Sequence, residues 1–401
     1  MVNEKAKELG NKPSVIRDLF EFGKKRKQEI GEENVYDFSI GNPSVPPPKC
    51  VTDALVDLLK NTEPTALHGY TSAVGDRNVR VAISEYLNKT YNAKTSGDLI
   101  YLTVGAAASL TTSFNALLNA GEEVVVFAPF FPEYRVFIEK AGGVVRVVNP
   151  IEPTFLPDFE EFEKAITPKT KAVLINSPNN PTGVVLKTED IEKIAEILNK
   201  KQQEFGSEIY LISDEPYREL LYADIEYPFV TNFYDNSIVC YSFSKSISLP
   251  GERIGYILVN PKCKDAKDVY AAVCGAGRTL GYVCAPALFQ YVIPHCLGKT
   301  SDLCVYKTNR DKIYQALTDM GYEVVKPDGA FYLFVKALEK DANAFSEVAK
   351  KFELLLVPSD SFGYGGYVRI SYCVSTKQIE ASIPAFKRLI EYYKKEEKWY
   401  G

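Results

Sequence analysis

Short runs of apolar residues recur along the first three quarters of the chain, and stretches with helical spacing separate them. The runs are continuous and rich in Val and Ile, which is typical of strands buried on both faces of a parallel sheet. They cover residues 123–127, 144–148, 172–176, 209–213, 238–242 and 254–259. The clearest helical pattern, at 190–200, has Ile191, Ile194 and Leu198 on one face and charged residues opposite. This alternation predicts an α/β domain with a largely parallel sheet flanked by helices.

The pattern changes after about residue 290. A long helical pattern at 302–320 is followed by the runs 322–326 and 330–335, a helix near 344–352, the run 367–373 and a last helix at 377–394. This order favours a smaller α+β domain. We therefore expect a large domain at 46–290 and a small domain at 291–401. The N-terminal segment, 1–45, is expected to pack on the small domain, because the first strand signal of the large domain comes much later.

Composition narrows the function classes. The 401 residues carry a net charge of −5 with no long basic stripe, which argues against a nucleic-acid partner. Eight Cys and two His form no metal-ligand spacing, so we expect no metal site, and scattered thiols suit a reducing cytoplasm. No signal peptide and no apolar run long enough to cross a membrane is visible. A cytoplasmic protein without membrane contact is the expectation.

Two charged residues lie at predicted strand ends. Lys245 closely follows the run 238–242, and Asp214 directly follows the run 209–213. Ligands of open α/β sheets bind at the carboxyl ends of strands. Alone, such a lysine is usually a surface charge and such an aspartate a helix cap. A buried acid must find a cation or hydrogen bonds, and a protonated pyridine nitrogen would serve.

Two further segments add to this pattern. Residues 176–183 (NSPNNPTG) crowd turn-forming residues at the end of another run. Residues 103–110 (TVGAAASL) place small residues where a helix opens, which leaves backbone N–H groups free to hold a phosphate. Either segment alone would be an ordinary loop or a tightly packed helix.

Together the four segments resemble the pyridoxal-phosphate-dependent aminotransferases of class I/II, the fold type I enzymes that include aspartate aminotransferase. The resemblance runs from about Ser39 to Tyr372. It implies that Lys245 is the Schiff-base lysine and that Asp214 pairs with the pyridine nitrogen. It also implies that Asn180 and Tyr217 hydrogen-bond the 3′ oxygen of the cofactor.

The resemblance assigns further residues to the cofactor and the substrate. By this likeness, the cofactor phosphate is held by Gly105, Ala106, Ala107, Ser242 and Arg253, its ring is stacked by Phe131, and Tyr70 reaches the phosphate of the neighbouring subunit in a homodimer. Substrate contacts fall to Arg369 at the α-carboxylate, with Gly41 and Asn180 bordering it. At Ala107 the family often has Ser or Thr, so one phosphate hydroxyl is missing here.

Substrate preference is harder to infer. Arg278, in the segment 275–281 (GAGRTLG), is a candidate for binding a second carboxylate, because members acting on aspartate have an arginine of the neighbouring subunit near this region. A salt bridge within the dimer is the alternative. We expect transfer from an L-amino acid, aspartate first, to a 2-oxo acid such as 2-oxoglutarate.

Three other functions share the same residues. A C–S β-lyase and an aromatic or alanine-type aminotransferase would use all the motifs named. A regulator with an aminotransferase-like sensor domain would need an N-terminal helix-turn-helix, and the motifs begin by Ser39, which disfavours it.

Overall fold

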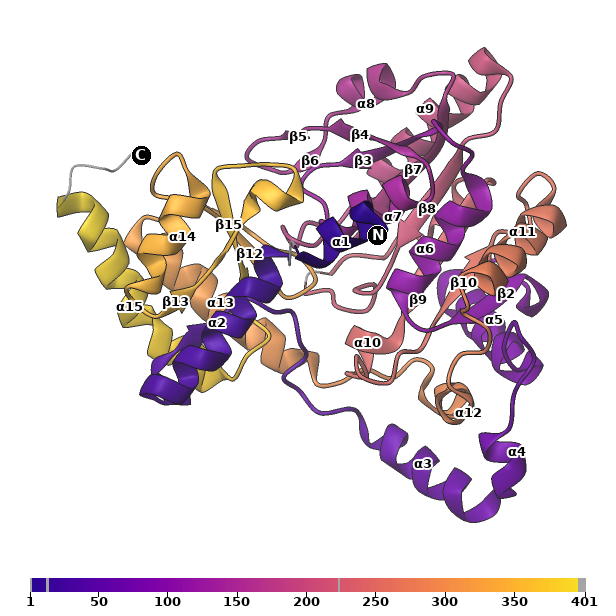
Figure 1. Cartoon of the computed structure of the whole chain (residues 1–401), viewed down its shortest axis with the longest axis horizontal. Coiled ribbons are helices and arrows are strands. Elements are labelled where there is room, and N and C mark those ends of the chain that lie inside the picture. The colour runs from indigo at the N-terminus through magenta and orange to yellow at the C-terminus, as the bar shows by residue number, and fades with distance from the viewer. Residues whose placement is uncertain (1, 12–13, 223, 396–401) are drawn as a thin grey trace.

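The computed structural model describes residues 2–11, 14–222 and 224–395, and its centre is a seven-stranded sheet (Figure 1). The strand order is β2-β10-β9-β8-β7-β3-β4. Their bounds are Ile100–Thr103 for β2, Glu123–Phe127 for β3, Val144–Val148 for β4, Thr170–Asn176 for β7, Tyr210–Asp214 for β8, Ser237–Ser242 for β9 and Gly255–Val259 for β10. Only β10 runs against its neighbours, which confirms the largely parallel sheet.

Helices cover both faces of this sheet because its strands bury alternate residues on opposite sides. One face packs on α6 (Ala106–Leu117), α7 (Glu133–Lys140) and α11 (Ala266–Thr279). The other packs on α3 (Lys49–Asn61), α5 (Arg77–Tyr91), α8 (Phe159–Ala165), α9 (Thr188–Phe205) and α12 (Ala287–Cys296). Two shorter helices are α4 (Pro64–His68) and α10 (Phe243–Ser246), and the hairpin β5 (Pro150–Ile151) and β6 (Leu156–Pro157) follows β4.

One predicted feature of the sheet is wrong. Strand β4 was expected to be buried on both faces, but Val144 is 45% exposed and Val147 is 37% exposed. The reason is that β4 is an edge strand with which only β3 pairs, whereas the outer side of the other edge strand, β2, is covered by the segment at Val74, whose carbonyl oxygen accepts the N–H of Leu102 over 3.0 Å. Strand β2, in contrast, is fully buried at the other edge and was not among the predicted runs.

A second, four-stranded sheet forms the core of the C-terminal part, in the order β11-β12-β15-β14. Its strands are β11 (Val324–Val325), β12 (Tyr332–Lys336), β14 (Val357–Pro358) and β15 (Tyr367–Ser371). The helices α13 (Leu303–Met320), α14 (Ala342–Lys350) and α15 (Thr376–Lys395) belong to the same part of the chain. The division at residues 45 and 290 stays a prediction.

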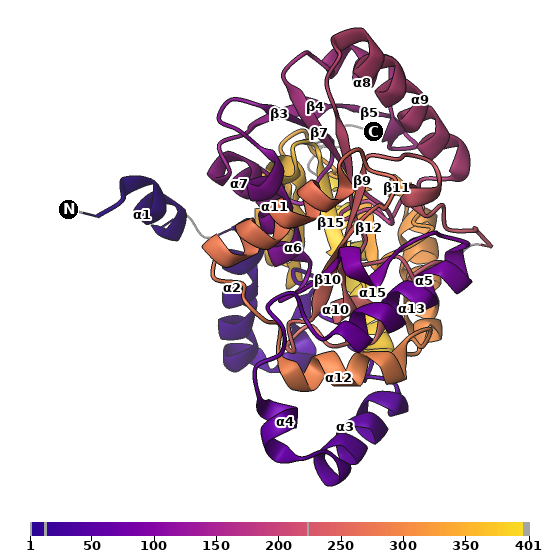
Figure 2. The ribbon, with the colours of Figure 1, turned by 90° about the vertical axis from the view of Figure 1, so that its right-hand side faces the viewer.

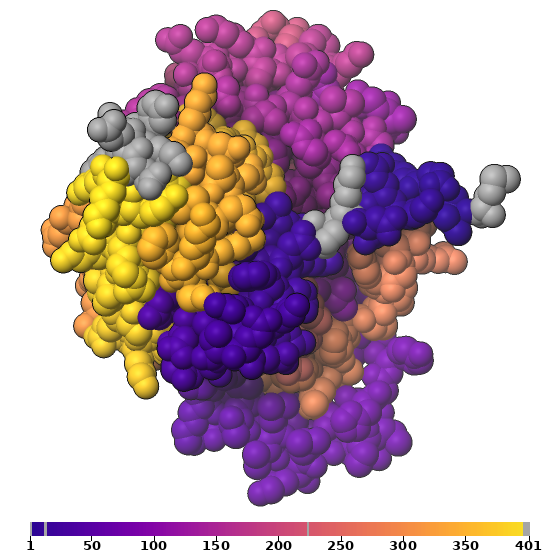
Figure 3. Space-filling view, turned by 60° about the vertical axis from the view of Figure 1, so that its left-hand side comes forward, coloured from indigo at the N-terminus to yellow at the C-terminus, as the bar shows by residue number. Residues whose placement is uncertain are grey.

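The N-terminal segment behaves in two ways. Helix α2 (Val15–Ile30) packs on the C-terminal part, where the indigo N-terminal segment lies against orange and yellow residues (Figure 3). Strand β1 (Tyr36–Asp37) pairs with β13 (Leu354–Leu355). Helix α1 (Glu4–Asn11) buries no side chain and projects from the rest of the molecule (Figure 2). No helix among the described residues is long and apolar enough to cross a membrane.

Candidate active site

The carboxyl ends of three neighbouring strands of the large sheet lie side by side, and this end of the sheet is called the edge below. Asn176 is paired in register with Asp214, and Asp214 with Cys240, so β7, β8 and β9 end side by side. Because β10 runs in the opposite direction, it begins where β9 ends, and Arg253 just before it lies at the same edge. The fold therefore gathers residues that are far apart in the sequence.

A cavity of about 560 Å³ opens at this edge. Eleven of the residues singled out in the sequence line it: Gly41, Ala106, Ala107, Phe131, Asn180, Asp214, Tyr217, Ser242, Lys245, Arg253 and Arg369. Three do not, namely Gly105, Tyr70 and Arg278. Gly105 lies against Arg253, which does line the cavity. The side chains of Tyr70 and Arg278 are exposed.

An anion-binding turn forms one wall of the cavity. Gly105 caps α6 with φ +92°, which side chains rarely adopt, and a Cβ there would lie 2.7 Å from Nη2 of Arg253. The first N–H groups of α6 have no partner within the helix, and the helix dipole favours a negative group there. Arg253, held by a 2.8 Å bond from Nη1 to the carbonyl oxygen of Pro250, adds a cation. This wall suits a phosphate.

Lys245 lies on the short helix α10, whose N-cap is Ser242. Its Nζ donates to the carbonyl oxygen of Gly41 over 2.5 Å. Burial, with smaller contributions from Arg369 and Arg253, lowers the pKa of Lys245 to about 8. An amine in this range is a better nucleophile and base near neutral pH than an ordinary lysine.

Asp214 is buried at the end of β8 with one oxygen engaged and one free. Tyr134 donates its O–H to Oδ2 over 2.5 Å, and Oδ1 has no partner among the described residues. Burial raises the pKa of Asp214 to about 7, the Tyr134 hydrogen bond opposes that rise, and the charge of Glu215 adds to it. A protonated nitrogen at Oδ1 would satisfy the free oxygen and stabilise the carboxylate.

Arg369 is a fully buried cation on β15. Its Nη1 donates to Oδ1 of Asn180 over 3.1 Å, and its Nη2 donates to the carbonyl oxygen of Ser39 over 2.5 Å. Within the described residues no carboxylate pairs with it, and Nε has no partner. Burial lowers the pKa of Arg369. Because a buried cation without an anion is costly, the site favours a carboxylate ligand here.

Several residues at the site were missed in the sequence. Tyr134 bonds Asp214, Asn176 accepts the backbone N–H of Asn180 over 2.8 Å, and Tyr332 shares a 2.8 Å hydrogen bond with Tyr217. The ring of Tyr332 also lies 4.7 Å from the guanidinium carbon of Arg369. Asn176 is the first residue of the turn segment 176–183, so its position could have been predicted from the sequence. Tyr134 and Tyr332 lie in no motif that indicates a role at the site.

The N-terminal segment also reaches the cavity. Ser14, Ile16 and Arg17, at the start of α2, line its outer part. Ser14 caps α2 by accepting the N–H of Arg17. The side chain of Arg17 is exposed, so a further cation lies in the exposed part of the cavity that holds Arg369.

Comparison with known proteins places this geometry in a family. The sequence profile of the family "Aminotransferase class I and II" matches residues 33–386. An aspartate aminotransferase of Thermotoga maritima is 32% identical over 357 residues, which cover 88% of this chain and 90% of the relative.

Two solved structures agree. An amino transferase of Eubacterium rectale superposes with a TM-score of 0.96 at 53% identity and covers 98% of this chain and 99% of the other. The aspartate aminotransferase of Thermus thermophilus with maleate has a TM-score of 0.85 at 26% identity, covering 97% and 99%. The chain therefore belongs to the class I and II aminotransferases.

Proposed function

We propose that this aminotransferase uses pyridoxal phosphate and moves an amino group from an L-amino acid, aspartate first, to a 2-oxo acid such as 2-oxoglutarate. The observation that carries the proposal is that one cavity is lined by Lys245, by Asp214, whose Oδ1 has no partner among the described residues, and by Ala106 and Ala107 of the anion-binding turn. A phosphate on the turn and a protonated ring nitrogen at Asp214 fit those groups. The family to which the chain belongs uses this cofactor.

The cofactor, when bound, supplies a ring that accepts the negative charge left at the substrate α-carbon. Asp214 would hold the ring nitrogen protonated through Oδ1, while Tyr134 keeps Oδ2 in place. Asn180 and Tyr217, both buried, are assigned to the 3′ oxygen, and Phe131 to the ring face.

The substrate is assigned to the part of the cavity that Arg369 lines. Arg369, rigidly held by Asn180 and Ser39, would bind the α-carboxylate through the guanidinium N–H groups left free. Lys245 would then move the proton from the α-carbon, since its pKa of about 8 leaves part of the amine neutral near pH 7. Gly41 accepts from the lysine and borders the same space.

Aspartate as the donor rests on the named relatives. Two of them are aspartate aminotransferases, and one was solved with maleate, a four-carbon dicarboxylate. A second carboxylate needs a second cation, and we assign it to Arg278 of a neighbouring subunit. Arg17 is the alternative on the same chain, because it lines the cavity.

We propose a homodimer in which each site borrows residues from the partner. The Tyr70 side chain is 100% exposed, and the segment that follows α11 contacts the next residue, with Cys284 Sγ 3.4 Å from the carbonyl oxygen of Thr71. Tyr70 and Arg278 thus come from adjacent surface segments. The eight cysteines are free thiols, which supports a reducing cytoplasm as the location.

The test combines cofactor colour with a donor panel. Purified protein with pyridoxal phosphate should develop visible absorbance, and borohydride should fix the cofactor to Lys245. Protein that stays colourless, or that is labelled at another lysine, would overturn the proposal. Aspartate and 2-oxoglutarate should then yield glutamate, whereas release of pyruvate and ammonia from an amino acid alone would favour the β-lyase.

A further inference from the structure

A buried ion cluster lies directly behind the candidate site. Arg218 follows Tyr217 and is only 2% exposed. Its Nη1 lies 3.0 Å from Oε2 of Glu215, and its Nη2 lies 3.2 Å from Oε1 of Glu219. Both nitrogens also donate to the hydroxyl of Tyr256, at 3.3 and 3.2 Å. The guanidinium carbon lies 4.2 Å from the centre of the Tyr241 ring, so this cation is held on several sides.

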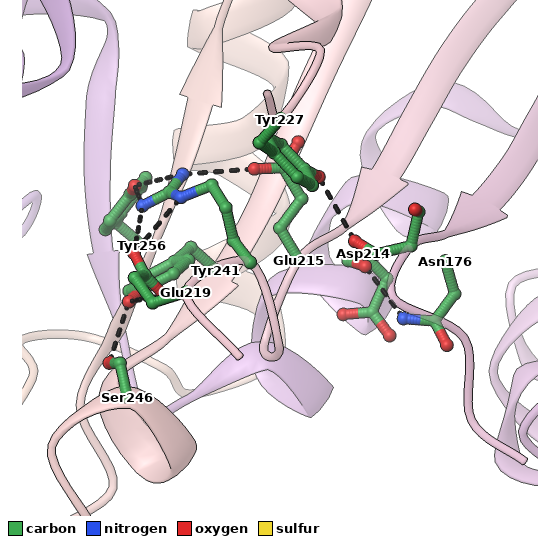
Figure 4. Close-up of polar contacts among 10 residues, drawn as sticks. Asn176, Asp214, Glu215, Glu219, Tyr227, Tyr241, Ser246 and Tyr256 are labelled. Carbon is green, nitrogen blue, oxygen red and sulfur yellow. Dashed lines mark hydrogen bonds and ion pairs between the residues drawn. The ribbon is translucent and has the colours of Figure 1, made fainter. Parts of the chain in front are cut away.

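The cluster continues to the lysine. Tyr241 donates its O–H to Oε2 of Glu219 over 2.9 Å, and its hydroxyl also lies 2.8 Å from Oγ of Ser246 (Figure 4). Ser246 is the residue after Lys245 on the four-residue helix α10. An unbroken chain of polar contacts therefore runs from Arg218 to the helix that carries the lysine.

The other end of the cluster is connected to Asp214 through the backbone, because Glu215 is the next residue. Figure 4 shows Asp214 and Asn176 on one side of Glu215, and Tyr256 on the other. Asp214, Pro216 and Tyr217 line the cavity, whereas Glu215 and Arg218 of the same segment are buried and do not line it. The same short turn thus carries cofactor-facing residues on one side and the ion cluster on the other.

This arrangement restricts motion at both ends. A guanidinium group is planar and offers donors in fixed directions, so it sets the positions of two carboxylates at once. Removing the Arg218 charge would leave the buried Glu215 carboxylate without its cation. The turn at Asp214–Tyr217 and the helix at Lys245 follow different strands, β8 and β9, and this cluster connects them.

We propose that Arg218 is a positioning residue that, with Glu219, Tyr241 and Ser246, fixes the Asp214–Tyr217 turn relative to Lys245. This inference rests on the proposed function, because the positions matter only if both residues act on one bound cofactor. Displacements of about 1 Å at reacting groups can lower rates by about a hundredfold. The cluster would therefore affect turnover more than substrate binding.

Two variants and a matched control test the positioning role of Arg218. Arg218→Lys keeps the positive charge but loses the planar set of guanidinium donors. Tyr241→Phe removes the hydroxyl that joins Glu219 to Ser246. Tyr234→Phe is the control, because the Tyr234 hydroxyl is also buried and donates over 2.7 Å to a backbone oxygen, that of Ile209, outside the cluster. Holoenzyme is measured for melting temperature, kcat, KM, and the pH midpoint of the cofactor absorbance.

We expect both cluster variants to lower kcat about tenfold or more, to change KM by less than about threefold, and to shift the absorbance midpoint by about half a pH unit or more. Tyr234→Phe should lower only the melting temperature. If the cluster variants match the control, with unchanged kcat and midpoint, the cluster is purely structural and the inference is wrong. If the wild-type protein itself takes up no cofactor, the proposed function fails instead. A Tyr241→Phe protein that folds decides the matter even where Arg218→Lys does not fold.

Discussion

Tyr134 donates its hydroxyl to one oxygen of Asp214 and leaves the other buried without a partner among the described residues. The pKa of Asp214, about 7, is far above the value of about 3.9 for an unfolded aspartate. Between those values the folded cofactor-free protein binds a proton that the unfolded chain does not. The contribution of this carboxyl to stability is therefore present below about pH 4 and is lost as the pH rises towards 7.

Asp214→Asn should consequently stabilise the cofactor-free protein. The gain should be near zero at about pH 4 and on the order of 4 kcal/mol above pH 7, and activity with cofactor should be nearly abolished. Urea unfolding of both cofactor-free proteins across this pH range measures it. Equal stability at pH 8 would show that the buried acid is not destabilising.

The rate of cofactor uptake should follow the ionisation of Lys245. The neutral amine is the nucleophile, so the rate of colour formation should rise with pH through a midpoint near 8. Arg369 contributes to this low pKa, and Arg369→Met should move the midpoint upward. Stopped-flow absorbance gives both values. A wild-type midpoint near that of an ordinary lysine would contradict the prediction.

Replacing Arg369 by lysine should lower kcat/KM about a hundredfold for every amino acid donor. The charge is kept, but the planar pair of donors to a carboxylate is lost, and Asn180 and Ser39 lose partners. Initial rates with aspartate and with alanine measure the effect. A loss confined to aspartate would place Arg369 at the side chain of the substrate instead.

The side-chain carboxylate of aspartate could be bound by either of two arginines, Arg278 or Arg17. Arg278→Ala should lower kcat/KM about tenfold or more with aspartate and leave alanine within about twofold. Arg17→Ala is the matched comparison, since Arg17 lines the cavity of its own chain. If the aspartate-specific loss follows Arg17, the assignment to Arg278 is wrong.

Subunit mixing tests the shared site. Tyr70→Ala and Lys245→Ala homodimers should each be nearly inactive. After unfolding and refolding together, mixed dimers should regain activity in one of their two sites, because an intact lysine then meets an intact tyrosine from the partner. No regain would show that Tyr70 acts within its own chain or not at all.

The sequence allowed much of this architecture to be predicted, and the limits have physical causes. Buried parallel strands have continuous apolar runs, so β3, β7 and β9 were found to within a few residues. The edge position of β4 could not be predicted from the sequence, because Val is common at both buried and exposed positions of strands. Local segments marked Lys245 and Asp214.

Contacts between distant segments could not be foreseen. Tyr134 lies 80 residues from Asp214, and the Tyr217–Tyr332 pair is 115 residues apart, so nothing local joins them. The roles carried over from the family likeness concern residues in local motifs. The ion cluster behind the site, in contrast, could not be predicted, because its residues come from segments at three strands, β8, β9 and β10.

The reversed direction of β10 restricts how this protein can tolerate changes in length. Ser242 ends β9 and Gly255 begins β10 opposite it, so the twelve residues between them form a closed loop that carries both the lysine and Arg253. Inserting or deleting one residue there would shift one of these cations relative to the other. Insertions elsewhere on the surface, as at the exposed residues 152–154 between β5 and β6, would leave that spacing untouched.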